Sequence, residues 1–321
     1  MENEKKIIID DLVSEILKDY QDDKVINQQA IFSQPDKDSV NDLLQKLIKI
    51  MYPGYYKGTS FRFYNLNSQI AVLLEDIMYN LHKQVRLALP QNPYNRKLSE
   101  AQLEDKTQEI CYQFFKKIPS IRELVETDVA AFFDGDPAAY NYNEIILCYP
   151  GLLAITTNRI AHELHLLKVP LIPRMMTEYA HSKTGIDIHP GATIGKNFFI
   201  DHGTGIVVGE TTIIGDNVKV YQGVTIGALS TRGGQKLKGV KRHPTIEDDV
   251  IIYAGASILG GETVIGKGAV IGSNAFITSS IEAGARVSIK NQELSIKSGD
   301  KRNLVRSEER RVGKECRSRW S

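Results

Sequence analysis

The 321-residue sequence predicts an α + β-solenoid fold, with an N-terminal helical domain followed by a parallel β-helix of hexapeptide repeats. A change of period predicts this division. Up to about residue 180, apolar residues recur at steps of three and four, as they do on one face of an α-helix. From about residue 185 they recur every six residues, which is typical of a parallel β-helix.

The segment boundaries follow from these patterns. We place the helical domain at residues 1–182, the β-helix at 183–290 and a C-terminal tail at 291–306. The last stretch, 307–321, breaks all preceding patterns and resembles vector-encoded sequence, so we leave it out of the fold prediction.

The helical half is predicted from five periodic segments, at 12–20, 38–52, 68–89, 99–115 and 152–168. Proline and glycine predict breaks at 53–54, 90–93 and 170–173. This half carries no evident chemistry until its end. We expect it to contribute packing and oligomer formation.

The β-helix is predicted from a column of inward apolar residues. Each hexad supplies a short strand with one inward β-branched residue and then a tight turn, and three hexads close a coil of about eighteen residues. A β-sandwich is disfavoured because its period would be two. The expected column is Ile188, Ile194, Ile200, Ile206, Val208, Ile214, Val220, Ile226, Ile246, Ile252, Ile258, Val264, Val270 and Phe276.

The repeat is interrupted twice. A two-residue slip separates Ile206 from Val208, just after Asp201 and His202. A long insertion, GALSTRGGQKLKGVKRHPT, then separates Ile226 from the next hexad and carries six basic or histidine side chains. Loops that leave a rigid solenoid are common places for binding groups, so we expect the site near these breaks.

Composition excludes some classes of function. A net charge of +1 gives no general argument for nucleic acid, and no apolar run approaches the roughly 20 residues that span a bilayer. The acidic N-terminus does not resemble a signal peptide, so we expect a cytoplasmic protein. Three cysteines, Cys111, Cys148 and Cys316, match neither a metal motif nor a disulfide framework.

Asp187 and His202 are the strongest candidates for chemistry. They are fifteen residues apart, so they should lie on adjacent coils near one corner. A carboxylate beside an imidazole fixes its tautomer and leaves the other ring nitrogen free as a general base. His189 has no second signal and is interpreted as structural.

Several stretches together resemble bacterial and plant serine O-acetyltransferases. They are IDIHPGATIGKNFFIDHGTGIVVGE at 186–210, YQGVTIGALS at 221–230, KRHPTI at 241–246 and YAGASILGG at 253–261, with DGDPAAY and NRIAHEL in the helical half. The likeness covers about 134–280 well. It implies a left-handed β-helix, a homotrimer or dimer of trimers, and active sites between neighbouring subunits.

The resemblance also implies roles for particular residues. By this likeness, His202 is the general base and Asp187 orients it. Asp136 and Asp201 would hold the ammonium group of serine, and a zwitterionic acceptor does need acids at one end and a guanidinium at the other. The remaining implied residues are Arg242 and His243 for the serine carboxylate, and Gly227, Ala228, Ala254 and Ser273 along the pantetheine channel.

The implied reaction is acetyl transfer from acetyl-CoA to the hydroxyl of L-serine, giving O-acetyl-L-serine and CoA by direct attack, without metal. This would be the first step of cysteine biosynthesis from serine. In the family, the C-terminus can dock into cysteine synthase. The sequence departs from the family pattern in the last coil, where it lacks the usual GxPA closing motif.

Other interpretations stay open at this stage. The acceptor could be another amino acid or a sugar, although Asp136 with Arg242 favours an amino acid. A zinc β-helix hydratase would need three converging histidines, and a scaffold would need no polar clusters at the register breaks. Asp136 could merely cap the following helix, and Arg242 with His243 could be a solvated basic loop.

Overall fold

The computed structural model describes residues 2–21, 24–27, 34–56 and 66–290, with two short strands beyond them. It contains two compact units. The first is Met1–Ile121 with Ile160–Tyr179, and the second is Arg122–Arg159 with Ala180–Ser321. Residues 307–321 lie outside the described residues, so the interpretation of that stretch stays a prediction. None of the described helices is long and apolar enough to span a membrane.

The predicted helices are confirmed, with differences at their ends. The observed α-helices are α1 (Glu2–Tyr20), α2 (Lys37–Met51), α3 (Leu66–Ala88), α4 (Glu100–Gly135), α5 (Tyr142–Cys148), α6 (Pro150–Leu166) and α7 (Ile172–Thr184). Two 3₁₀ helices, η2 (Leu89–Gln91) and η3 (Pro93–Asn95), occupy the break predicted at 90–93. The break predicted at 170–173 is too long, because α7 begins at Ile172 and Pro173 is tolerated in its first turn.

Helix α4 is much longer than predicted. The sequence pattern ended it at residue 115, but it continues through Pro119 to Gly135. Proline inside a helix removes a hydrogen bond and costs about 3 kcal/mol. Phe114, Ile121, Val125 and Phe132 are all buried along the helix, on both sides of the proline. Their burial offsets this cost.

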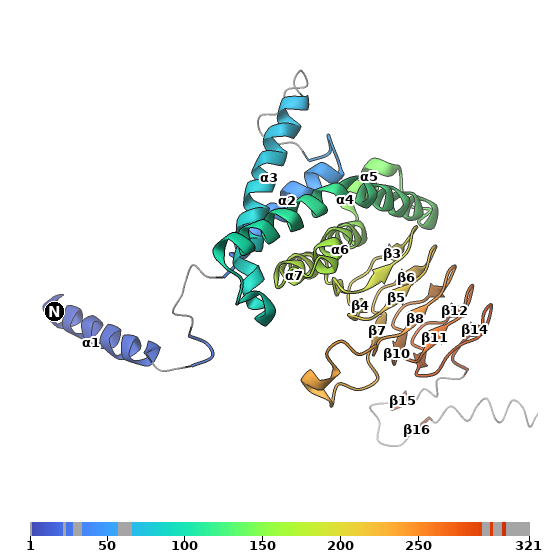
Figure 1. Ribbon diagram of the computed structural model, residues 1–321. Helices are drawn as coiled ribbons and strands as arrows, with labels where there is room; N and C mark the ends of the chain where they lie inside the picture. The colour runs from blue at the N-terminus through green and yellow to red at the C-terminus, as the bar shows by residue number, and fades with distance from the viewer. Residues whose placement is uncertain are drawn as a thin grey trace, which may run out of the picture. The chain divides into compact units, whose positions relative to one another are not determined.

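The second half of the chain is a parallel β-solenoid, as the hexads predict (Figure 1). Its strands form three parallel sheets. Sheet A contains β1 (Asp187–Ile188), β4 (Val207–Val208), β7 (Thr225–Gly227), β10 (Ser257–Leu259) and β13 (Phe276–Ile277). Sheet B contains β2 (Thr193–Ile194), β5 (Ile213–Ile214), β8 (Thr245–Ile246) and β11 (Val264–Ile265). Sheet C contains β3 (Phe199–Asp201), β6 (Lys219–Tyr221), β9 (Ile251–Ile252), β12 (Val270–Ile271) and β14 (Arg286–Val287).

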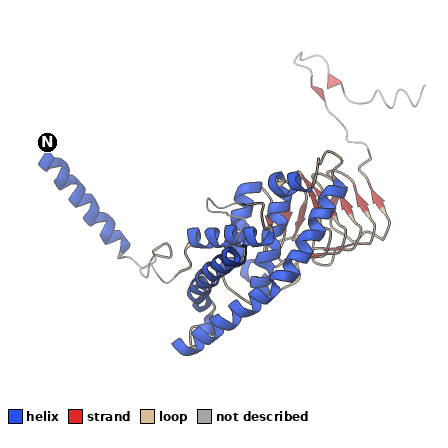
Figure 2. Cartoon of the chain, turned by 90° about the horizontal axis from the view of Figure 1, so that it is seen from above, coloured by secondary structure: helices blue, strands red, loops and turns tan. Residues whose placement is uncertain are grey.

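The strands are two or three residues long and succeed one another around the coil, as the red arrows of Figure 2 show. The register confirms both predicted interruptions. Ile188 pairs with Val208 at the two-residue slip, and Ile226 pairs with Ile258 across the insertion. The insertion contains the 3₁₀ helix η4 (Gly234–Leu237). Beyond the solenoid, β15 (Ile296–Lys297) and β16 (Leu304–Val305) pair antiparallel.

The predicted column is correct up to Ile258 and wrong by one residue after it. Ile265, Ile271 and Ile277 are buried in place of the residues before them, and Phe276 is 70% exposed. The added residue falls at the corner after β10, where Gly260 has a φ of +105°. A shift of one residue exchanges the inward and outward sides of a strand.

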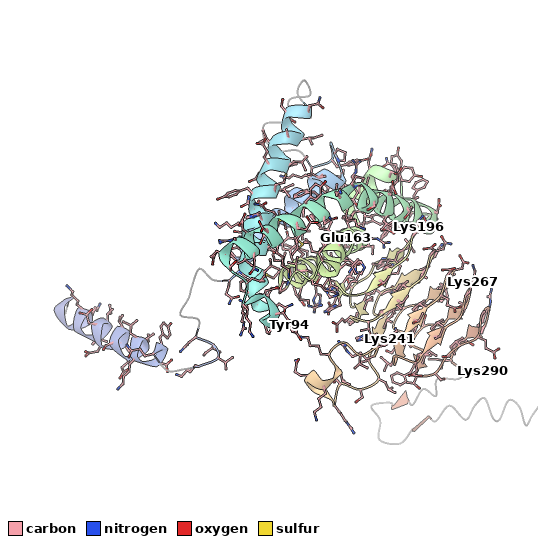
Figure 3. The ribbon with its side chains drawn as sticks, viewed as in Figure 1. Tyr94, Glu163, Lys196, Lys241, Lys267 and Lys290 are labelled. Carbon is pink, nitrogen blue, oxygen red and sulfur yellow. The ribbon has the colours of Figure 1, made fainter. Side chains whose placement is uncertain are left out.

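The corner between sheets B and C is built from residues that tolerate left-handed backbone. Asn197, Asn217 and Asp249 all have φ between +56° and +60°. Their side chains form a ladder, in which Asn197 donates to Asn217 at 2.8 Å and Asn217 donates to Asp249 at 2.9 Å. Asn and Asp accept this conformation more readily than other non-glycine residues. Figure 3 labels Lys196, on the coil of Asn197, and Lys267, on the coil that follows that of Asp249.

Candidate active site

The end of β3 brings two predicted residues together. Asp201 closes the strand, and His202 follows with a φ of +55° and a side chain that is 74% exposed. The His202 Nε2 lies 3.7 Å from the Asp201 Oδ1. The next residue, Gly203, has no room for a side chain, because a Cβ there would lie 2.5 Å from the Cδ1 of Ile186.

Asp187 opens the first coil, which runs from β1 to β3 and ends at His202, so the two residues do not lie on adjacent coils as their spacing predicts. Asp187 begins β1, pairs in register with Val207 and donates its N–H to the carbonyl of Ile206 at 2.9 Å. The contact of Ile186 with Gly203 places Asp187 and His202 on either side of one packed corner. The carboxylate that the structure pairs with the His202 imidazole is that of Asp201, so orientation by Asp187 stays a prediction.

Asp136 has a partner that the sequence did not reveal. It lies in the turn after α4, where Tyr149 donates its hydroxyl to Asp136 Oδ2 at 2.6 Å and the Ala138 N–H donates to Oδ1 at 2.8 Å. The helix-cap alternative is wrong, because α5 is capped by Asn141, whose side chain accepts from the Glu144 N–H at 3.0 Å. Asp136 is therefore free of that structural role.

The charges at this corner act on one another. The hydrogen bond from Tyr149 lowers the pKa of Asp136 below its usual value, and the Ala138 N–H and the charge of His202 lower it further. The same bond, with burial and nearby acids including Asp201, raises the pKa of Tyr149 to about 12. Asp136, Asp201 and His202 thus belong to one electrostatic cluster, which we call the acid corner.

Arg242 and His243 lie where the insertion returns to the solenoid. The Arg242 side chain forms an ion pair with Glu210, and its backbone N–H donates to the Thr211 Oγ1 at 2.9 Å. The His243 ring is buried, and its Nδ1 accepts the Thr211 N–H at 3.0 Å. Glu210 and Thr211 were not predicted, since only the path of the insertion brings them to Arg242.

His243 is neutral at ordinary pH. Burial lowers its pKa to about 4, and the positive charges of Arg242 and Lys241 act in the same direction against the opposing charge of Glu210. Because Nδ1 accepts a hydrogen bond, the proton of the neutral ring lies on Nε2. That ring edge packs over Gly209, where a Cβ would overlap it.

Within one chain, the predicted residues form two groups at opposite ends of β4. The acid corner precedes this strand, whereas Arg242 and His243 pack against the residues that follow it. The residues predicted to line the pantetheine channel also lie in two places. Gly227 and Ala228 stand at the end of β7, while Ala254 and Ser273 lie on successive coils at the corner before β10 and β13.

Comparison with known proteins identifies the family. A family model described as serine acetyltransferase, N-terminal, matches residues 71–157. A serine acetyltransferase of Synechococcus elongatus is 43% identical over 229 residues, which are 70% of this chain and 72% of that protein. The chain belongs to the serine acetyltransferase family.

Solved structures agree with this membership. Serine acetyltransferase 1 of Entamoeba histolytica in complex with L-cysteine is 38% identical, with a TM-score of 0.67, over 77% of this chain and 86% of that one. The Neisseria gonorrhoeae serine acetyltransferase in complex with serine is 27% identical, with a TM-score of 0.51, over 77% of this chain and 95% of that one. This chain is therefore a serine O-acetyltransferase, an acyltransferase with a helical region and a parallel β-solenoid.

Proposed function

We propose that the chain transfers the acetyl group of acetyl-CoA to the hydroxyl of L-serine with His202 as general base. The neutral imidazole removes the hydroxyl proton as the serine oxygen attacks the thioester carbon. The carbon–sulfur bond breaks, and the imidazolium returns the proton to the CoA sulfur. The products are O-acetyl-L-serine and CoA. Asp187 and Asp201 stabilise the imidazolium and orient the ring.

The acid corner is the observation that carries the proposal. The ammonium group of serine would bind between Asp136 and Asp201, with the serine hydroxyl directed to His202. A low pKa keeps Asp136 ionised over the range in which serine is a zwitterion. Three independent residues from two elements share this corner, which supports a binding role over a chance surface cluster.

Arg242 and His243 would bind the serine carboxylate. The guanidinium is held by Glu210, so it is oriented before the substrate arrives. The neutral His243 would donate from Nε2, which is consistent with its low pKa. Acetyl-CoA would lie along the small residues Gly227, Ala228, Ala254 and Ser273, where short side chains leave room for the narrow pantetheine arm.

We further propose that the site forms between copies of the chain, in a homotrimer or a dimer of trimers. Arg242 and the acid corner lie at opposite ends of β4, so one serine is reached by both groups only if neighbouring copies contribute one group each. Docking into cysteine synthase stays a prediction, since residues 306–321 lie outside the described part of the chain.

The function is tested by thiol release from acetyl-CoA, with L-serine, L-homoserine or no acceptor, by the wild type and by His202→Asn. Asparagine accepts the left-handed backbone at this position better than alanine does. We expect release that depends on L-serine, and a loss of about 10²–10⁴ in kcat in the variant.

The matched control is His165→Asn on α6, a histidine with no proposed part in the chemistry. It should keep wild-type kcat. Near-normal turnover by a folded His202→Asn enzyme would rule out His202 as the base, and equal release with and without L-serine would rule out the acceptor.

A further inference from the structure

Tyr149 donates a hydrogen bond to Asp136 of the acid corner, and this position suggests a role in substrate binding. We propose that it is a positioning residue for the amino group of the acceptor. Its hydroxyl fixes the Asp136 carboxylate beside Asp201, so that the two carboxylates bind one ammonium group together. This inference rests on the proposed function and adds a residue that acts through Asp136.

The hydrogen bonds of Asp136 define the direction of its carboxylate. Oδ2 accepts the Tyr149 hydroxyl at 2.6 Å, and Oδ1 accepts the Ala138 N–H at 2.8 Å. Among the described residues, each oxygen has one donor and keeps a second lone pair. The carboxylate is therefore held from both sides and can still accept from an ammonium group.

Tyr149 is itself anchored to the strand that carries Asp201. Its ring packs edge-on against Phe132, with centroids 6.2 Å apart, and Phe132 packs edge-on against Phe199 at 5.2 Å. Phe132 is fully buried, and Phe199 stands two residues before Asp201 in β3. A continuous aromatic contact therefore links the partner of Asp136 to the strand of Asp201.

Two glycines make this close packing possible. A Cβ at Gly151, two residues after Tyr149, would lie 2.9 Å from the carbonyl oxygen of Ile200. A Cβ at Gly135, next to Asp136, would lie 3.0 Å from the Phe199 ring. The chain on either side of Asp136 and Tyr149 thus lies directly on β3, which sets where both side chains meet Asp201.

The charges around the Tyr149 hydroxyl keep it neutral, so that it can donate a hydrogen bond to the Asp136 carboxylate. Its pKa is raised to about 12, first by the hydrogen bond to Asp136, then by burial and by Asp136, Glu144 and Asp201. It stays protonated at every pH at which the enzyme would work. Three acids act on this hydroxyl, so the ammonium group of serine would supply a countercharge to an acid-rich corner.

The test is the steady-state kinetics of Tyr149→Phe, which keeps the ring against Phe132 and removes the hydroxyl. A hydrogen bond to a charged group that is partly exposed predicts a rise of about tenfold in the KM for L-serine. The kcat and the KM for acetyl-CoA should change by less than about twofold, because neither depends on the ammonium group. Tyr140→Phe, at a tyrosine that is 87% exposed, is the matched control and should match the wild type.

A second variant tests whether Tyr149 acts through Asp136. Asp136→Asn should raise the KM for L-serine by at least as much, and adding Tyr149→Phe to it should change that KM by less than about twofold. Additive effects of the two changes would overturn the inference, as would a Tyr149→Phe enzyme with wild-type KM for L-serine or with a loss confined to kcat. No serine-dependent release by the wild type would instead overturn the proposed function, and the inference with it.

Discussion

His243 is a residue whose ionisation is strongly changed by its surroundings. Its ring is buried against Gly209, its Nδ1 is occupied by the Thr211 N–H, and Arg242 stands beside it in sequence. A proton added to this ring would have to displace that hydrogen bond in a site with positive neighbours. The fold therefore stabilises the neutral form, the form that donates from Nε2.

This low pKa predicts how stability depends on pH. The histidine of the unfolded chain binds a proton below about pH 6.5, whereas that of the folded chain does not until about pH 4. The contribution of His243 to the stability of the fold is therefore present above pH 6.5 and is lost as the pH falls toward 4. At pH 5 the loss is about 2 kcal/mol. We expect urea denaturation to show that the free energy of unfolding falls more between pH 7.5 and pH 5.0 in the wild type than in His243→Gln. An equal fall in both proteins would mean that His243 is not buried neutral.

Single residues of the site differ in how far the sequence reveals them. His202, Asp201 and Asp136 stand in short motifs, whereas the fifteen-residue spacing wrongly predicts adjacent coils for Asp187 and His202, which both belong to the first coil. Tyr149 and Glu210 carry no motif of their own. Tyr149 is recognised only because the turns after α4 bring it to Asp136, thirteen residues away. Glu210 is recognised only because the insertion brings Arg242 to it, thirty-two residues away.

At the scale of elements, a buried ion pair ties α4 and α6 to the first coil of the solenoid. Asp128 accepts from Arg159 through both oxygens, at 3.0 and 3.1 Å, and also from the Phe198 N–H at 3.0 Å. The Arg159 guanidinium donates as well to the carbonyl oxygens of Ile194 and Gly195. Both side chains are almost fully buried, so every charge here is matched.

Breaking this pair should be costly. Asp128→Asn leaves the buried guanidinium without its countercharge, and we expect the free energy of unfolding to fall by about 3–5 kcal/mol. Glu100→Gln, at the 85% exposed partner of Arg86, is the control and should cost less than about 1 kcal/mol. Chemical denaturation followed by circular dichroism measures both changes. Similar losses of unfolding free energy in the two variants would contradict this prediction, because the buried Asp128–Arg159 pair would then matter no more than an exposed one.

Helices and strands were predicted well where a single periodicity of apolar residues determines them. They were predicted less well where contacts between distant segments determine their ends or their register. The hexads predicted three sheets, the two-residue slip and the long insertion. They missed the added residue after Ile258, because Val264-Ile265 and Val270-Ile271 offer two apolar residues in succession and either could face inward. The extension of α4 past Pro119 was missed because the burial of Phe132 against β3 is not local in sequence.

For the molecule as a whole, we propose that acetyl transfer occurs at a site shared by neighbouring copies. One chain places the acid corner before β4 and Arg242 after it. Under this proposal, a serine bound by both groups bridges two chains, and each copy would contribute to two sites. Oligomers commonly form such head-to-tail interfaces around a closed ring.

Complementation measures this directly. His202→Asn and Arg242→Ala should each abolish serine-dependent thiol release when expressed alone. Co-expressed with different tags and purified through both, mixed oligomers should recover about a third of wild-type activity if they are trimers and about a quarter if they are dimers of trimers. In every mixed trimer, one of the three interfaces joins an intact His202 to an intact Arg242. Mixed oligomers that assemble but recover no activity would contradict a shared site, and would place His202 and Arg242 in the same single-chain centre.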